Sequence, residues 1–174
     1  SAFSTLDPSH ALCLLAADEA LKDASYKFGK WDPDRVGVSL AFLPYQGKKF
    51  LADIRINWNE FEHELGKALE ERAIPRGTAT ALLREAEARF KENLPPVTED
   101  TLTGYLGSLN AGRLTWFHDF HGPHFVVDAA CASAHAALHA AWKMLSHRTA
   151  DVVLSGGVWA DMMPEFFVAA CRFN

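Results

Sequence analysis

Three short apolar segments along the chain predict β-strands. They lie at residues 35–42, 124–128 and 151–158, and each is rich in residues that favour extended structure. The stretches between them place apolar residues at helical rather than alternating spacing. Strands that alternate with helices indicate an α/β fold, with mixed or parallel pairing of the strands.

Two stretches carry clear helix signals. Near the start, Asp7 is a good capping residue and Pro8 suits the first helical position. Residues 58–93 are rich in charge and contain two apolar stripes, which predict two amphipathic helices separated by Pro75 and Gly77. The stripes consist of Phe61, Leu65 and Leu69 in the first helix and Leu82, Leu83, Ala86 and Phe90 in the second.

Composition narrows the class of protein. The chain has 174 residues, of which 49% are hydrophobic, so it can bury a sizeable core. Its net charge of -5 is spread along the chain and provides no basic face for nucleic acid or anionic lipid. No apolar run is long enough to span a bilayer. Three cysteines at unrelated spacings argue against a disulfide framework, so we expect a reducing, cytoplasmic setting.

The residues around Cys131 single it out as a candidate nucleophile. The strand residues 125–127 are followed by Asp128, and every residue from 129 to 134 except the cysteine is alanine or serine. These small side chains allow a sharp turn and leave the sulfur accessible. In the first turn of the helix predicted beyond it, unpaired N–H groups and the helix dipole favour the reactive thiolate. A free cysteine alone is more often a small buried hydrophobe.

Four segments in the same order resemble the β-ketoacyl synthase family of the thiolase superfamily. The cysteine segment is similar to that family's active-site strand, turn and alanine-rich helix, and the later strand ends in its glycine pair. The matching segments are DPSHALCLLAADEALKDA (7–24), RVGVSLA (35–41), LNAGRLTWFHDFHGPHF (109–125) and VDAACASAHAALHAA (127–141) with DVVLSGGV (151–158).

This resemblance implies a thiolase-like layered αβαβα fold, of which the chain would form mostly the first half. Residues 1–174 would be a partial ketosynthase domain that lacks the family's first segment and its C-terminal half. The family's two catalytic histidines, its lysine and its glycine-rich loop would belong to that second half, so we expect this chain to be incomplete as a catalyst. Residues 44–98 would form a helical insertion, most like the ketosynthases of polyunsaturated-fatty-acid and iterative polyketide synthases.

The resemblance also implies a reaction. Cys131 would accept an acyl group from a phosphopantetheine thioester, and its backbone N–H would supply half of an oxyanion hole. Decarboxylative Claisen condensation with a malonyl-type extender on an acyl carrier protein would follow. No metal or redox cofactor is needed, because loss of the extender's carboxylate generates the carbanion. The implied partners are the acyl carrier protein, the remaining ketosynthase half and a second copy in a homodimer.

Ala170 is the candidate substrate-binding residue. In many ketosynthases the matching position holds a bulky phenylalanine that gates the acyl pocket, so an alanine would admit a longer or bulkier chain. Two alternative functions stay open. One is another thiolase-fold acyltransferase that uses coenzyme A, such as a thiolase or a type III polyketide synthase. The other is a non-condensing ketosynthase-like module that binds acyl groups or dimerises.

The histidines suggest a further alternative. Cys131, His135 and His139 recur four residues apart and could share one helix face, as metal ligands do. The pattern is weak without an obvious fourth ligand, and a packed, hydrogen-bonded histidine is the commoner case. Three other histidines are expected to lie in a turn and an edge strand near the subunit interface. They are His118, His121 and His124.

Overall fold

A three-stranded parallel sheet organises the part of the chain that the structure describes. The computed structural model describes residues 6–24, 31–43, 47–160 and 163–172. Strand order is β2-β1-β3, with β1 at Val36–Ala41, β2 at His124–Val127 and β3 at Val152–Gly157. The helices are α2 (Pro8–Asp23), α3 (Gly47–Ile56), α4 (Trp58–Glu71), α5 (Arg76–Glu92), α6 (Thr101–Tyr105), α7 (Gly107–His118), α8 (Ser133–Ser146) and α9 (Pro164–Ala170). Short 3-10 turns lie at Pro33–Arg35 and Ala130–Ala132.

All three strands predicted from the sequence are confirmed, and their pairing is parallel. Val38 of β1 is opposite His124 of β2, and Val36 is opposite Val152 of β3. Every residue of β1 is buried, as expected for the central strand of a sheet covered on both faces. Parallel strands need crossover connections, and helices provide them here.

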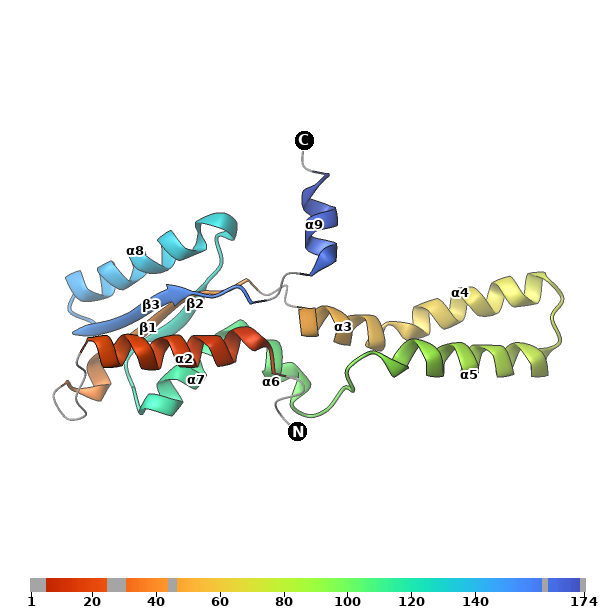
Figure 1. Ribbon diagram of the computed structural model, residues 1–174, viewed down its shortest axis with the longest axis horizontal. Helices are drawn as coiled ribbons and strands as arrows, with labels where there is room; N and C mark the ends of the chain where they lie inside the picture. The colour runs from red at the N-terminus through yellow and green to blue at the C-terminus, as the bar shows by residue number, and fades with distance from the viewer. Residues whose placement is uncertain (1–5, 25–30, 44–46, 161–162, 173–174) are drawn as a thin grey trace.

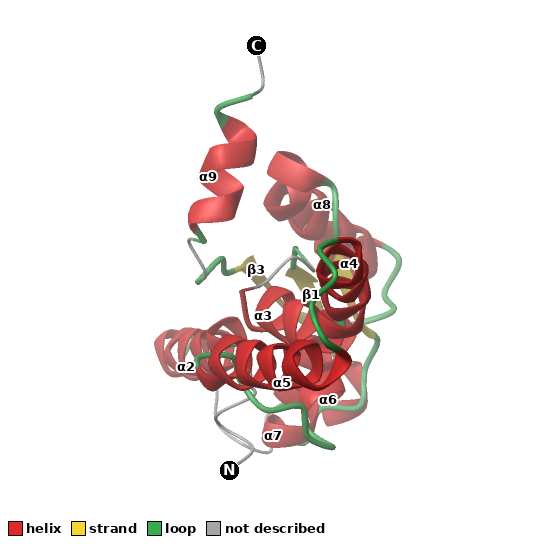
Figure 2. Ribbon diagram, turned by 90° about the vertical axis from the view of Figure 1, so that its right-hand side faces the viewer, coloured by secondary structure: helices red, strands yellow, loops and turns green. Residues whose placement is uncertain are grey.

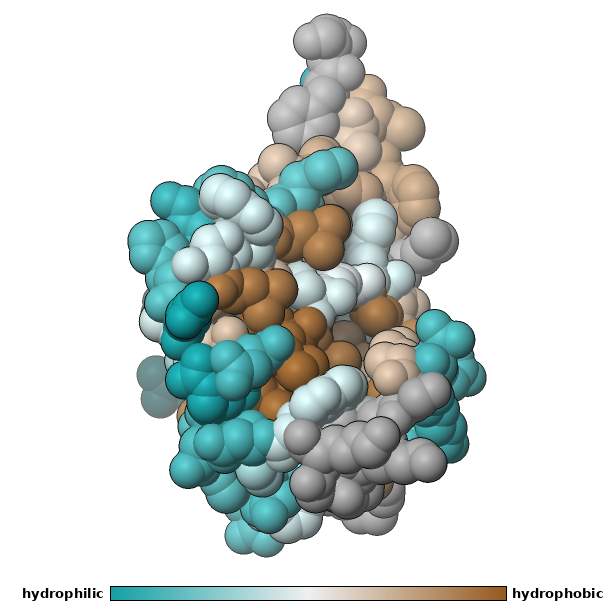
Figure 3. Space-filling view, turned by 90° about the vertical axis from the view of Figure 1, so that its left-hand side faces the viewer, coloured by the Kyte–Doolittle hydropathy of each residue, from teal (hydrophilic) through white to brown (hydrophobic). Residues whose placement is uncertain are grey.

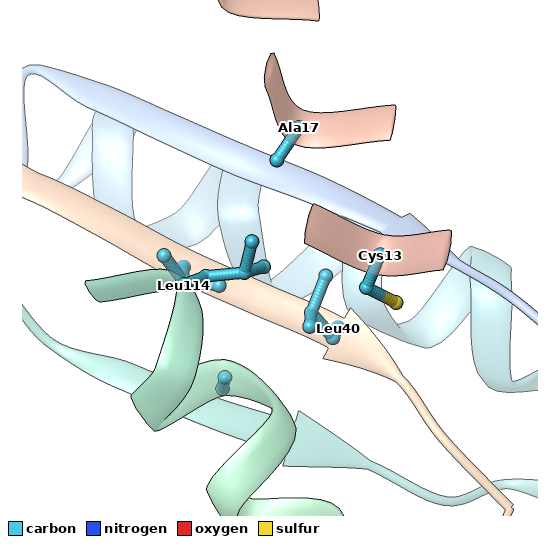
Figure 4. Close-up of a cluster of buried hydrophobic side chains, with 6 residues drawn as sticks. Cys13, Ala17, Leu40 and Leu114 are labelled. Atoms are coloured by element: carbon cyan, nitrogen blue, oxygen red, sulfur yellow. The ribbon is translucent and has the colours of Figure 1, made fainter. Parts of the chain in front are cut away.

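Helices cover both faces of this sheet. Helix α8 lies on one face, and α2 and α7 lie on the other (Figure 1). The main core cluster forms where α2 and α7 meet β1 (Figure 4), and it contains Cys13, Ala17, Val38, Leu40, Ala111 and Leu114. The prediction that α2 starts at an Asp7 cap is confirmed, because the Asp7 carboxylate accepts a hydrogen bond from the Ser9 N–H at 2.8 Å.

The end of the sheet where the strands begin is closed by a second cluster of buried residues, Leu21, Val36 and Phe120. Viewed from that end, apolar side chains gather at the centre and hydrophilic ones surround them (Figure 3). The chain enters β2 through Gly122, where an added Cβ would lie 2.4 Å from the Val36 carbonyl oxygen. Only glycine allows this close approach of the two backbones.

The two amphipathic helices predicted for residues 58–93 are confirmed as α4 and α5. They form an antiparallel hairpin that extends away from the sheet (Figures 1 and 2), and we call this hairpin the arm. Trp58 is buried and packs against Phe90, with ring centroids 4.8 Å apart and ring planes tilted by 40°. At its base, the Arg55 side chain donates to the carbonyl oxygens of Lys91 and Leu94, at 2.7 and 3.0 Å.

Within the described ranges, no helix combines the length and the apolar character that crossing a bilayer requires.

Candidate active site

Cys131 lies between the end of β2 and the start of α8. The 3-10 turn Ala130–Ala132 carries the cysteine and runs directly into α8 at Ser133. The expectation that Cys131 sits in the first turn of the long helix is therefore wrong by one short turn. Its side chain is exposed, so a reactant can approach the sulfur. We call residues 128–133 the elbow.

The elbow turns sharply at Ala130. Its φ of 49° lies in the left-handed region, which a non-glycine residue enters at a cost of about 1–2 kcal/mol. Such conformations persist only where surrounding contacts hold them, and they gather at functional sites. Cys131 directly follows this left-handed residue and is exposed.

Hydrogen bonds hold this strained backbone. The Asp128 carboxylate accepts from the Ala130 N–H at 3.0 Å. The Ser133 hydroxyl accepts from the Ala129 N–H at 2.8 Å and donates to the Ala130 carbonyl at 2.6 Å. Sequence reasoning identified Asp128 only as the end of a strand and Ser133 only as a small residue. A carboxylate and a hydroxyl on either side of a turn are the available signal, since both side chains bond nearby backbone.

The helix behind the elbow is fixed to the sheet. Ala137 and Ala141 lie on the buried side of α8, where small side chains allow a close approach to β1. The buried Ser39 hydroxyl of β1 donates to the Ala137 carbonyl at 3.0 Å. The position of the elbow is therefore set by the central strand as well as by local hydrogen bonds.

Ala170, the other predicted site residue, ends α9. This helix follows β3, whereas the elbow follows β2, so both lie beyond the carboxyl ends of parallel strands. Figure 1 shows α9 and the start of α8 at the same end of the sheet. Ligands of α/β sheets bind at that end. Ala170 is half-buried, while Phe166 and Phe167 on the same helix are exposed.

The structure does not join Cys131, His135 and His139 into a metal site. Both histidines are exposed, and the His139 ring stacks on Trp142 with centroids 5.7 Å apart. Within the described ranges, no three histidine, cysteine, aspartate or glutamate side chains come together as metal ligands would.

The other three histidines, His118, His121 and His124, do not all lie where the sequence predicted. His121 is in a turn and contacts Asp34 and Asp119, at 2.7 and 3.1 Å, and these carboxylates raise its pKa. His124 begins β2, an edge strand of the described sheet, so the predicted turn and edge-strand positions are confirmed for these two residues, and their nearness to a subunit interface stays a prediction. It is wrong for His118, which is buried at the end of α7 and stacks on Phe120.

A buried polar cluster lies between α2 and α7. His10 is fully buried, and its Nδ1 atom contacts the Arg113 guanidinium, which also donates to the Thr103 carbonyl at 2.8 Å. Burial and, secondly, the charge of Arg113 lower the pKa of His10 from 6.5 to about 4. Nearby, Asn110 donates to the Cys13 sulfur at 3.3 Å. Cys13 is buried in the core cluster, as its sequence context predicted, and this burial raises the pKa of its thiol.

The elbow thus presents an exposed cysteine on a left-handed turn between a parallel strand and a helix. The family model for the N-terminal domain of β-ketoacyl synthases matches residues 1–174. The chain belongs to this family, as its motifs predicted.

Curated relatives come from synthases of fatty acids and polyketides. The chain is 28% identical over 163 residues to one component of the polyunsaturated fatty acid synthase of Thraustochytrium sp., covering 94% of the chain and 6% of that protein. It is 31% identical over 159 residues to one component of the phenolphthiocerol/phthiocerol polyketide synthase of Mycobacterium tuberculosis, covering 82% and 10%. The chain thus spans a small part of the relatives it matches.

Solved structures confirm the fold class. A ketosynthase from module 6 of the bacillaene synthase of Bacillus subtilis aligns with a TM-score of 0.59 and 19% identity, covering 96% of this chain and 21% of that one. A type II polyketide ketosynthase, AntDE, in complex with its acyl carrier protein AntF gives a TM-score of 0.63 and 17% identity, covering 93% and 37%. The chain has the N-terminal part of their thiolase-like fold, with one sheet between two helical layers.

Proposed function

We propose that the protein carrying this chain is a β-ketoacyl synthase in which Cys131 is the acyl-accepting nucleophile. The observation that carries the proposal is the exposed Cys131 on the elbow at the carboxyl end of β2, in a chain of the ketosynthase family. A thiol at this position can form a covalent intermediate and divide one difficult reaction into two easier ones.

Acyl transfer comes first. The Cys131 thiolate attacks the carbonyl carbon of an acyl thioester on phosphopantetheine, and the carbonyl oxygen becomes an oxyanion. The Cys131 backbone N–H is one donor to that oxyanion. When the intermediate collapses, the carbon–sulfur bond to phosphopantetheine breaks, and the leaving thiolate takes up a proton. The acyl group remains on Cys131.

Condensation follows on the same acyl-enzyme. A malonyl-type extender on an acyl carrier protein loses carbon dioxide, and the resulting carbanion attacks the Cys131 thioester. The carbon–carbon bond forms, the cysteine sulfur leaves, and the product stays on the carrier protein. The groups that promote decarboxylation belong to the remaining ketosynthase half in this proposal.

The proposal includes a homodimer formed through β2. As the edge of the described sheet, β2 presents backbone groups that a second strand can pair with. Apolar side chains are exposed beside it: Phe125 on the strand is 36% exposed, and Trp116 and Phe117 at the end of α7 are 83% and 63% exposed. Surface of this kind is typical of a contact with another chain.

Two further parts of the proposal concern substrate and setting. Ala170, at the same end of the sheet as the elbow, lines the acyl pocket and leaves room for a long or bulky chain. Equal turnover of short and long acyl thioesters by wild type and Ala170→Phe would contradict this assignment. A reducing, cytoplasmic compartment suits a nucleophile that works only as a free thiol.

The test is to trap the acyl-enzyme. The complete native polypeptide is incubated with an acyl thioester of its carrier protein, and its intact mass and the modified peptide are then determined. We expect one acyl group on Cys131, none after Cys131→Ala, and normal loading after Cys171→Ala, which removes another exposed cysteine. Loading from coenzyme A in preference to the carrier protein would favour the alternative acyltransferase. Loading without release of carbon dioxide from the malonyl extender would favour the non-condensing module.

A further inference from the structure

The Ser133 side chain spans the elbow with both of its hydrogen-bonding functions in use. Ser133 is only 9% exposed, although it is the first residue of α8. Its oxygen accepts from the Ala129 N–H, and its hydroxyl hydrogen is donated to the Ala130 carbonyl in the short 2.6 Å contact. One side chain therefore restrains the peptide groups on both sides of the strained residue.

The second of these bonds bears directly on Cys131. The Ala130 carbonyl and the Cys131 N–H belong to one peptide unit, which is planar and trans, so the two groups point in opposite directions. Fixing the carbonyl oxygen therefore fixes the direction of the Cys131 N–H. Without that bond, this peptide can rotate as the left-handed strain at Ala130 relaxes.

We infer that Ser133 is a positioning residue that aims the Cys131 N–H at the oxyanion formed during acyl transfer. The inference rests on the proposed function, since it needs Cys131 to react with a thioester. It adds a residue that acts through the backbone next to Cys131. An oxyanion donor is effective because it is oriented before the reaction, so a donor left free to rotate stabilises the transition state less.

A purely structural role for Ser133 predicts a different outcome. If the hydroxyl only stabilised the start of α8, its loss would move the sulfur and slow every reaction of Cys131 to a similar extent. Alkylation by iodoacetamide uses the same sulfur but forms no oxyanion. Comparing alkylation with acyl transfer therefore separates the position of the sulfur from the direction of the N–H.

The experiment compares four forms of the complete native polypeptide: wild type, Ser133→Ala, Ser133→Thr and Ser146→Ala. Ser146 is a matched control, because it lies at the far end of α8 and its hydroxyl donates to the Trp142 carbonyl at 2.8 Å. For each form, the rate constants are measured for acylation of Cys131 by hexanoyl-N-acetylcysteamine and for its alkylation by iodoacetamide.

We expect Ser133→Ala to slow acylation by roughly 10- to 100-fold, less than the outright loss of an oxyanion donor. Its alkylation should stay within about twofold of wild type, because the sulfur remains exposed. Ser133→Thr keeps the hydroxyl and should restore acylation, and Ser146→Ala should change neither rate. Acylation of Ser133→Ala at the wild-type rate, or an equal fall in both reactions, would overturn the inference. Failure of wild type itself to acylate would instead refute the proposed function.

Discussion

The sheet region and the arm are stabilised in different ways. The sheet region, which we define as the three strands with α2, α7 and α8, buries β1 completely and brings together residues far apart in the chain. The arm is held by contacts between its two helices and by ion pairs one helical turn apart, such as Arg89 with Glu85. Phe61, on α4, is 58% exposed.

The difference shows why the candidate chemistry lies where it does. An elbow with a residue at φ 49° has to be held by several contacts, and the sheet region provides them through β2, α8 and Ser39. The arm has a left-handed residue of its own, Ala73 at φ 54°, but Ala73 is exposed in the turn between α4 and α5, and the two helices bury only Trp58. A nucleophile needs a rigid support, whereas a surface hairpin tolerates movement.

Replacing a leucine by alanine should show the largest difference in stability cost between the sheet region and the arm. Leu114 is 1% exposed and lies in the core between α2, α7 and β1, whereas Leu65 of the arm is 41% exposed. Leu114→Ala should cost about 3–5 kcal/mol of the free energy of unfolding of the sheet region. Leu65→Ala should cost less than about 1 kcal/mol in the arm, since little apolar surface leaves the interior. Hydrogen exchange at α7 and α4 amides in the complete protein measures both, and equal costs would show that the arm is buried against something else.

Acid should weaken the sheet region before it weakens the arm. The pKa of His10 is about 4 in the folded chain, below the ordinary value of 6.5, because burial and Arg113 disfavour the charged ring. The unfolded chain therefore binds more protons between these two values, so stability is present above pH 6.5 and is lost as the pH falls towards 4.

The free energy of unfolding falls by at most about 3.4 kcal/mol over this range. Hydrogen exchange at α2, corrected for intrinsic rates, should show it in wild type, and His10→Gln should flatten the profile. Protection in α4 and α5, where Trp58 is the buried residue, should not follow this curve. An unchanged profile in His10→Gln would assign the acid sensitivity to another group.

The smallest expected changes in stability concern two arginines, Arg55 at the base of the arm and Arg89 within it. Arg55 donates to the carbonyls of Lys91 and Leu94 and so ties α3 to the end of α5. Arg55→Ala should lower the stability of this junction by about 1–2 kcal/mol, because two charged hydrogen bonds are lost. Arg89→Ala removes only a solvent-exposed pair with Glu85 and should cost at most about 0.5 kcal/mol. Hydrogen exchange at the last turn of α5 measures both, and a larger cost for Arg89→Ala would contradict the structure.

The sequence predicted most of the elements because their signals are local. The Asp7–Pro8 start of α2, the break between α4 and α5 and the three apolar strands depend on neighbouring residues, and each is confirmed. Helix α7 is not predicted as a separate helix from the sequence, because that segment is identified only by its resemblance to the ketosynthase family. His118 was consequently placed in a turn, although its burial depends on packing against Phe120.

The family and the candidate nucleophile could be determined from the sequence alone, because Cys131 sits in a motif whose residues are contiguous. The geometry of the site was decided by tertiary structure. The left-handed turn at Ala130 and the placement of the elbow at the same end of the sheet as α9 depend on the sheet, which pairs residues as distant in the chain as Val36 and Val152. So does the attachment of α8 to β1 through Ser39. Contiguous residues can specify which atom reacts, but only packing across the sheet fixes where that atom and its neighbouring N–H groups point.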